Sequence, residues 1–168
     1  MKLMRLPENK TAQFKADMKY AFRKGAADGL GKDEEVLPEE DINRSLSAKG
    51  AQAFVVMEKD EMIGGAIVII DDSTGNNYLD FLYVKVGHQG KKVGQFIWNV
   101  IEKLFPETKM WETCTTYFDI RNIHFYINGC GLSAVEFFNK KHPDPMFPND
   151  CYDEYFAGMF KFQKKMKL

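Results

Sequence analysis

Hydrophobic and polar positions repeat with two different periods along the chain, and the changes of period divide it into helices and strands. Apolar residues at helical spacing predict a first helix over 11–27. A proline and three acids then open a second helix over 38–48, and acids in a first turn favour the positive end of the helix dipole. After this helix the period shortens, so that 53–57 and 62–70 are expected to pair as a hairpin.

The middle of the chain predicts a central strand followed by an amphipathic helix. Residues 78–86 are apolar on both faces apart from Asp80 and Lys85, which is typical of a strand covered on both sides. Residues 92–104 carry one apolar stripe at helical spacing, and Pro106 follows where a helix is expected to stop. Asp80 is the anomaly in this strand, because it is an acid in an apolar environment.

The rest of the chain predicts a strand over 109–115, a short helix over 121–128, a strand over 132–138 and a last strand over 155–162. Helices and strands in this order are typical of a mixed sheet with helices packed on it, an α/β (α+β) fold. With no repeat and no convincing linker, residues 1–168 are expected to form a single domain.

Composition narrows the classes of protein to consider. The chain has 168 residues, of which 45% are hydrophobic and 28% charged, with a formal net charge of −1. These values indicate a soluble globular protein and argue against general binding to nucleic acid or to an anionic membrane. No apolar run approaches the roughly 20 residues that cross a bilayer, and the N-terminus is too polar to begin a secretory signal. We therefore expect a cytoplasmic protein.

The spacing of cysteine and histidine argues against a metal centre or a disulfide framework. There are three residues of each kind, with no CxxC pair and no HExxH spacing. They are Cys114, Cys130, Cys151, His88, His124 and His142. Cys114 lies in a strand-like run and is expected to be a small core residue.

The segment 84–94 joins the central strand to the amphipathic helix and has the features of an anion site. The first amides of a helix lack internal partners and converge on an anion, and Gly90 and Gly94 leave room for one to approach the backbone. Lys91 and Lys92 oppose the helix dipole, which is easier to explain if an anion binds there. The glycines are equally consistent with an ordinary tight turn, and neither GxxxxGK[ST] nor GxGxxG is present.

Two sequence blocks resemble the GNAT superfamily of acetyl-CoA-dependent N-acetyltransferases. The family fingerprint Q/R-x-x-G-x-G/A enters a helix after a strand of the type I-D-x-L-Y-V. This chain has the strand Leu79-Asp80-Phe81-Leu82-Tyr83-Val84 and then Gln89-Gly90-Lys91-Lys92-Val93-Gly94. Gln89 follows Val84 by five positions, as in the family, but Lys92 replaces the first glycine of the fingerprint.

The second block, 121–132, resembles the family's Asn…Phe-Tyr…Gly-Phe segment. It departs from that pattern twice: Leu132 replaces the phenylalanine, and Tyr126 is one residue farther from Gly131 than usual. The order of elements also resembles the GNAT fold over nearly the whole chain.

The resemblance implies a mostly antiparallel sheet that a bulge splays open at the cofactor slot. It implies direct transfer of an acetyl group from acetyl-CoA to a primary amine of a small molecule or peptide. The strand backbone would pair with the pantetheine arm, and the loop amides would hold the pyrophosphate. The cofactor-binding residues implied are Leu82, Tyr83, Val84, Gln89, Gly90, Lys91, Lys92, Val93, Gly94, Asn122 and Phe125.

The reaction needs a base to produce a neutral amine, and an acid can protonate the departing thiolate. Asp80 is the first candidate base, because burial would raise its pKa; alternatively it is a sheet-face acid paired with Lys85 or an arginine. Glu112 is the second candidate base, or an outward-facing strand residue. Tyr126 is the candidate acid, or a core aromatic. His124 is a further candidate base, or a surface residue.

The acceptor side is less defined by the sequence. The acidic run 28–41 either attracts a cationic amine as a lid over the acceptor site or is a solvated loop. Tyr83, Trp111, Tyr117 and Phe118 either form an aromatic wall or pack in the core. A non-catalytic acyl-CoA-binding or sensing module on the same fold is the alternative function. The last strand offers a surface for a homodimer, although no residue in it requires one.

Overall fold

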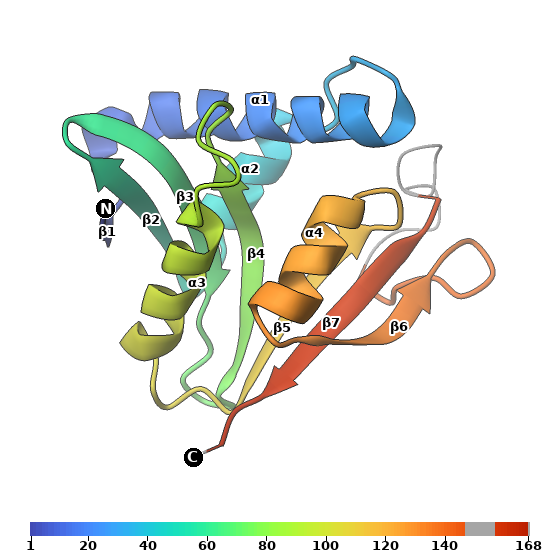
Figure 1. The fold of residues 1–168 in the computed structure, drawn as a ribbon. Helices are drawn as coiled ribbons and strands as arrows, with labels where there is room; N and C mark the ends of the chain where they lie inside the picture. Colours follow the sequence, from blue (N-terminus) through green and yellow to red (C-terminus); the bar gives the residue numbers. More distant parts are fainter. Residues whose placement is uncertain (147–156, 168) are drawn as a thin grey trace.

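The computed structural model describes residues 1–146 and 157–167, and within them one mixed sheet forms the centre of the molecule (Figure 1). Its seven strands run in the order β1-β2-β3-β4-β5-β7-β6. All neighbouring strands are antiparallel except β4 and β5, which are parallel. The strands are β1 (Lys2–Arg5), β2 (Ala51–Glu58), β3 (Glu61–Ile69), β4 (Asn76–Val84), β5 (Met110–Thr116), β6 (Ser133–Phe138) and β7 (Met159–Lys165). The predicted α/β mixed sheet is confirmed.

Helices cover both faces of this sheet. On one face lie α1 (Thr11–Leu30) and α2 (Glu39–Ser47), and on the other α3 (Val93–Leu104) and α4 (Ile120–His124). A short 3₁₀ turn, Glu8–Lys10, precedes α1. No helix among the described residues is long and apolar enough to cross a bilayer.

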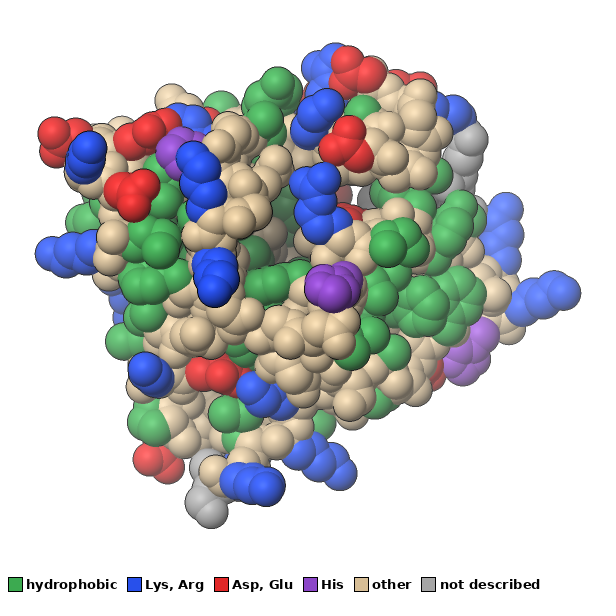
Figure 2. Space-filling view, viewed as in Figure 1, with side chains coloured by type: hydrophobic (Ala, Val, Ile, Leu, Met, Phe, Trp, Pro, Cys, Tyr) green, Lys and Arg blue, Asp and Glu red, His purple; other side chains and the backbone are tan. Residues whose placement is uncertain are grey.

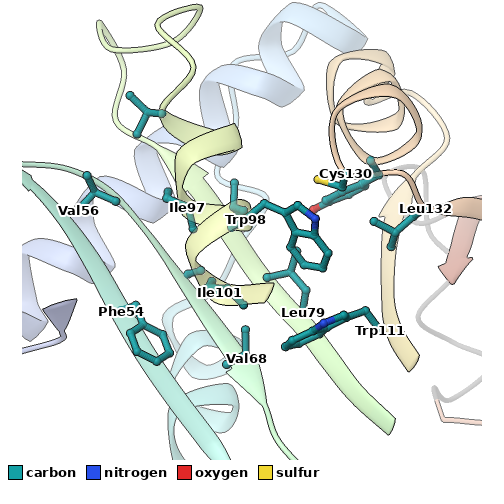
Figure 3. Close-up of a cluster of buried hydrophobic side chains, with 14 of the residues drawn as sticks. Phe54, Val56, Val68, Leu79, Ile97, Trp98, Ile101, Trp111, Cys130 and Leu132 are labelled. Carbon is teal, nitrogen blue, oxygen red and sulfur yellow. The ribbon is translucent and has the colours of Figure 1, made fainter. Parts of the chain in front are cut away.

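Each face of the sheet has its own hydrophobic cluster. On the α1/α2 face, Phe14, Met18 and Ile42 are fully buried against the strands. On the α3/α4 face, the indole rings of Trp98 and Trp111 meet edge to face with centroids 5.4 Å apart (Figure 3). These two clusters fix α1 and α3, the helices that flank the end of β4.

The sheet divides between β4 and β5. The two strands pair over three residues only, Asn76–Met110, Asn77–Trp111 and Tyr78–Glu112. Just beyond, the Thr113 hydroxyl donates a hydrogen bond of 2.8 Å to the carbonyl oxygen of Leu79, and the strands then diverge (Figure 1). The expected splay of the central sheet is therefore present, and the second half of β4 has no strand beside it on that side.

A β-bulge at Asp80 accompanies this divergence. Leu79 lies opposite Val68 and Phe81 opposite Ile67, so Asp80 is the extra residue and has no cross-strand neighbour. The bulge turns Asp80 and Phe81 to the same face. Phe81 packs in the α1/α2 cluster, and Asp80 accepts a hydrogen bond from Ser45 of α2. The bulge lies just before Leu82–Val84, where the family resemblance places the cofactor strand.

Three elements differ from the sequence expectation. The first helix runs to Leu30, because Gly31, with φ 71°, supplies the left-handed residue that ends it. Strand β1 was not expected, since its two basic and two apolar residues are too few to give a periodic signal. The last strand was expected over 155–162 but begins at Met159 and extends to Lys165; Tyr155, like Cys151, lies outside the described residues.

Candidate functional site

A cleft of about 780 Å³ opens where β4 and β5 diverge. Its walls are the second half of α1, the end of β4, the first turn of α3 and the segment that runs from β5 into α4. In the space-filling view the face that carries α3 and α4 is hollowed here, and Lys or Arg side chains gather around the hollow (Figure 2). A cleft of this size suits a drug-sized or cofactor-sized ligand.

Ten of the eleven residues expected to bind the cofactor line this cleft, and the exposed Lys91 is the exception. The ten come from two separate parts of the chain. They are Leu82, Tyr83, Val84, Gln89, Gly90, Lys92, Val93, Gly94, Asn122 and Phe125. The two sequence blocks are therefore brought together as opposite walls of one cleft.

The loop that enters α3 has the backbone of an anion site. Gly90 has φ 78° and Lys92 has φ 63°, so both lie in the left-handed region. Lys92 precedes the helix, and its carbonyl oxygen accepts the first helical bond from the Phe96 amide, at 3.0 Å. The amides of 93–95 therefore have no intrahelical acceptor and lie at the positive end of the helix dipole. Lys92 is thus left-handed at the position where the family fingerprint has a glycine, the residue that adopts this conformation without strain.

The opposite wall is organised by Asp119, which caps α4. Its Oδ1 accepts from the Asn122 amide at 3.0 Å, and its Oδ2 accepts from Asn122 Nδ2 at 2.8 Å. Because its Nδ2 is held by Asp119, the Asn122 side chain has its oxygen left as an acceptor. Burial raises the pKa of the Asp119 carboxyl, and the hydrogen bond from the Asn122 amide lowers it. Sequence reasoning missed Asp119; its position three residues before Asn122 is the N-cap signal that indicates its role.

The helix after Asn122 contains a π turn, Phe125–Gly129, closed by a bond of 2.9 Å from the Cys130 amide to the Phe125 carbonyl oxygen. A π turn accommodates one residue more than an α-helical turn. The π turn overlaps the interval from Tyr126 to Gly131, the two residues whose spacing in this chain is one residue longer than in the family pattern.

Tyr126 lies behind the cleft wall. The residue is 5% exposed, and its ring packs against Phe125 and Phe162. Burial raises the pKa of the Tyr126 hydroxyl, and the nearby Thr113 side chain, which bonds to Leu79 where β4 and β5 diverge, lowers that pKa. The ring packs as a core aromatic does, while the hydroxyl lies at the closed end of the splay.

Asp80 lies at the bulge, on the α1/α2 face, and does not line the cleft. The Ser45 hydroxyl donates a hydrogen bond to Asp80 Oδ2. Burial raises the pKa of the Asp80 carboxyl, the Ser45 hydrogen bond lowers it, and the nearby Asp41 raises it. The partner of Asp80 is therefore a hydroxyl; Lys85, the alternative partner suggested by the sequence, instead contacts Glu61 at 2.8 Å.

Two other candidate bases have different surroundings. Glu112 forms an ion pair of 2.7 Å with Lys161 on β7 and accepts a hydrogen bond of 3.3 Å from Gln163, away from the cleft lining. His124 lines the cleft, with its Nδ1 3.1 Å from Asn128 Nδ2.

Helix α1 contributes a wall that sequence reasoning missed. Its small residues Ala21, Gly25 and Gly29 line the cleft. A Cβ on Gly29 would be 3.0 Å from the carbonyl oxygen of Phe118, so α1 lies directly against the β5–α4 segment. No motif marks these small residues, because their role depends on a contact across 89 positions of sequence.

The other residues considered for the acceptor site, four aromatic residues and the acidic run 28–41, lie partly in the cleft, partly in the core and partly on the surface. Tyr83 and Phe118 line the cleft, whereas Trp111 is in the core and Tyr117 is 41% exposed. In the acidic run, Asp28 lines the cleft, while Asp33 and Glu35 form ion pairs with basic residues of α1. Among residues 1–146 and 157–167, no group of three or more His, Cys, Asp or Glu could hold a metal ion.

Comparison with known proteins agrees with this geometry. The family model described as the acetyltransferase (GNAT) family matches residues 19–132. YrkN of Bacillus subtilis (strain 168) is 34% identical over 167 residues, which cover 95% of this chain and 90% of YrkN.

Solved structures share the fold at low sequence identity. An IAA acetyltransferase from Bacillus cereus has a TM-score of 0.72 at 12% identity, with 98% of this chain and 99% of that chain covered. The PaiA N-acetyltransferase of Thermoplasma acidophilum, solved in complex with coenzyme A, has a TM-score of 0.69 at 15% identity, with 98% of each chain covered.

Proposed function

Since the chain belongs to the GNAT family of acetyltransferases, we propose that it transfers the acetyl group of acetyl-CoA to a primary amine of a small molecule or peptide. The observation that carries the proposal is the convergence of an anion-binding helix start and an unpaired strand end on one cleft. Few ligands need both features, and CoA does, because it joins a pyrophosphate to an extended arm with two amides.

The cleft divides into regions that match the parts of this co-substrate. The amides at the start of α3 would hold the pyrophosphate, with Lys92 at the same end. The backbone of Leu82–Val84 would pair with the pantetheine arm, as a neighbouring strand would. The side-chain oxygen of Asn122 would accept a hydrogen bond from one of its amide groups.

One half-buried and one buried group are proposed for the proton transfers. Asp80 is the proposed base: it lies at the bulge where the strands diverge, and burial raises its pKa toward the range useful for removing a proton from an ammonium. Because Asp80 does not line the cleft, the proton would reach it through water. The neutral amine then attacks the thioester carbonyl carbon, and the carbon–sulfur bond breaks. Tyr126 is the proposed acid for the thiolate, because its hydroxyl lies at the closed end of the splay and burial keeps it protonated. Glu112 remains the second candidate base.

The proposal is tested by supplying acetyl-CoA with a panel of polyamines, aminoglycosides, amino acids and peptides, and measuring release of the free CoA thiol. Turnover with at least one acceptor supports it. Coenzyme A binding without turnover on any acceptor would instead favour the non-catalytic acyl-CoA-binding module. The acetylated product, identified by mass spectrometry, establishes whether the acetyl group is on nitrogen.

A further inference from the structure

The loop that forms the proposed phosphate site has little secondary structure to hold its shape. It leaves β4 at Lys85, whose amide makes the last bond to β3, 3.0 Å from the Ile63 carbonyl oxygen. A turn follows, closed by the His88 amide donating to the Lys85 carbonyl oxygen at 3.0 Å. Between this turn and α3, Gly90 and Lys92 have positive φ. Contacts from outside the loop must therefore contribute to its position.

One carboxylate oxygen supplies two such contacts. Glu61, the first residue of β3, has Oε1 2.8 Å from Lys85 Nζ and 3.4 Å from His88 Nε2. Lys85 and His88 are the two ends of the turn, so Glu61 connects both of them to the neighbouring strand. The ion pair raises the pKa of Lys85 and lowers that of Glu61.

A second acid approaches the same turn from α1. Asp17 is 9% exposed, and its Oδ1 accepts a hydrogen bond of 2.7 Å from Gln13. Its charge also raises the pKa of Lys85. Asp17 Oδ2 and His88 Nδ1 are both buried and have no hydrogen-bond partner among the described residues. The base of the loop is thus a junction of β3, α1 and β4 that is built from charged groups.

Glu61 and Asp17 lie at the base of a loop that is proposed to bind phosphate, and their negative charges alone would oppose the binding of an anion. A carboxylate near a phosphate site lowers affinity by repulsion, so its removal would be expected to strengthen binding. The geometry points to a different role: we propose that Glu61 is a positioning residue, which holds Lys85 and His88 so that the amides of Gln89–Gly94 keep their arrangement for the CoA pyrophosphate. This inference rests on the proposed function.

The two explanations predict opposite signs for one substitution. Glu61→Gln removes the negative charge and weakens the attachment of the loop. If Glu61 positions the loop, the Kd for coenzyme A measured by titration calorimetry rises by about two- to five-fold, the range expected for one exposed ion pair. The KM for acetyl-CoA rises by a similar factor, kcat at saturating acetyl-CoA does not change, and the melting temperature falls by no more than about 4 °C.

Two further variants make the test specific. Glu58→Gln removes the same charge from the residue directly across the hairpin and should leave the Kd unchanged. The exchange Glu61→Lys with Lys85→Glu keeps the net charge and reverses the ion pair, and it should restore much of the affinity lost in Glu61→Gln.

Each result bears on a definite claim. An unchanged or lower Kd for Glu61→Gln, with the wild-type chain binding coenzyme A, overturns the positioning role and leaves the proposed function intact. An equal rise for Glu58→Gln also overturns it, because the effect would then not depend on the contacts of Glu61 with Lys85 and His88. A wild-type chain that does not bind coenzyme A overturns the proposed function, and this inference with it.

Discussion

The hydroxyl of Ser45 on α2 donates a hydrogen bond to Asp80 Oδ2 at the bulge of β4. This contact joins the helix on one face of the sheet to the residue at which the sheet divides. This hydrogen bond also favours the charged form of Asp80, which burial and the nearby Asp41 oppose. The protonation of the proposed base therefore depends on a residue 35 positions away.

Ser45→Ala is expected to raise the pKa of Asp80 further, because it removes the hydrogen bond that lowers it. A base must be deprotonated to act, so the acidic limb of the pH profile of kcat/KM should move to higher pH. The measurement is this profile for wild type and variant with one acceptor amine. A limb at the same pH in both would show that the titrating base is another residue.

Asp80→Asn is expected to lower kcat by about 10²- to 10⁴-fold, the usual contribution of a general base, without changing the Kd for coenzyme A. The same change should stabilise the fold at neutral pH. A carboxyl whose folded-state pKa is raised contributes stability that is present below its unfolded value and is lost as pH rises through the folded value.

The stability difference between Asp80→Asn and wild type should therefore be small below the ordinary aspartate value of 3.8 and grow as pH rises above it. Melting temperatures across this range test the sign. Glu112→Gln is the matched comparison for activity: if it lowers kcat as much as Asp80→Asn does, Asp80 is not the sole base.

Lys92→Gly and Lys92→Ala remove the same charge but differ at the backbone. A residue with a Cβ is strained at φ 63°, whereas glycine is not, so the glycine variant should be the more stable by about 1 kcal/mol. Urea denaturation gives both free energies of unfolding. Both variants should bind coenzyme A more weakly than wild type if the lysine charge contributes, and a stability order with alanine above glycine would contradict the backbone argument.

Asp119→Ala removes the cap of α4 and the support of the Asn122 side chain together. We expect a loss of about 1 kcal/mol in stability and a higher KM for acetyl-CoA. Asp119→Asn keeps a capping oxygen but removes the second acceptor, so its stability should stay close to wild type while KM still rises. Equal KM values for wild type and Asp119→Asn would argue against a role for the second hydrogen bond.

Trp98→Ala tests how far α3, and with it the anion loop, depends on the core. Trp98 is 1% exposed and packs against Trp111, so its truncation should cost about 3–5 kcal/mol. Leu104→Ala on the same helix, at a residue 50% exposed, should change stability by less than about 0.5 kcal/mol. Urea unfolding followed by far-UV circular dichroism measures both, without relying on tryptophan fluorescence.

The sequence predicted those elements whose pattern of apolar and polar residues matches the side of the element that is buried in the fold. Residues 92–104 show this: the apolar stripe is long, and the observed helix begins at Val93 and ends at Leu104. By contrast β7 extends past the predicted end at 162 to Lys165, and its Lys164 looks like a loop residue until the ion pair with Glu102 of α3 is known. A strand residue whose charge is neutralised by another element gives no strand signal in the sequence.

The candidate site was predictable to the same degree. Residues 82–94 form one continuous segment, and their chemistry depends on backbone conformation. Such a segment can be recognised from the sequence alone, because all its residues are neighbours along the chain. By contrast Gly25 and Gly29 acquire their positions only when α1 crosses to the β5–α4 segment. The bulge at Asp80 likewise depends on pairing with Val68 and Ile67, so a regular alternation along β4 could not reveal which way the carboxylate faces.

The short pairing between β4 and β5 has a consequence for folding cooperativity. Among the described residues, the part that contains β1 to β4 is joined along the sheet to the part that contains β5 to β7 by three residue pairs, by the Thr113–Leu79 hydrogen bond, and by the amides of Lys109 and Met110, which donate to the Gly75 carbonyl oxygen. Regions joined by so few backbone bonds open at lower free energy than either region unfolds, and hydrogen exchange resolves such units. A molecule that contacts both walls of the cleft would join the two into one cooperative unit, so its binding should slow exchange at amides far from any atom that it touches.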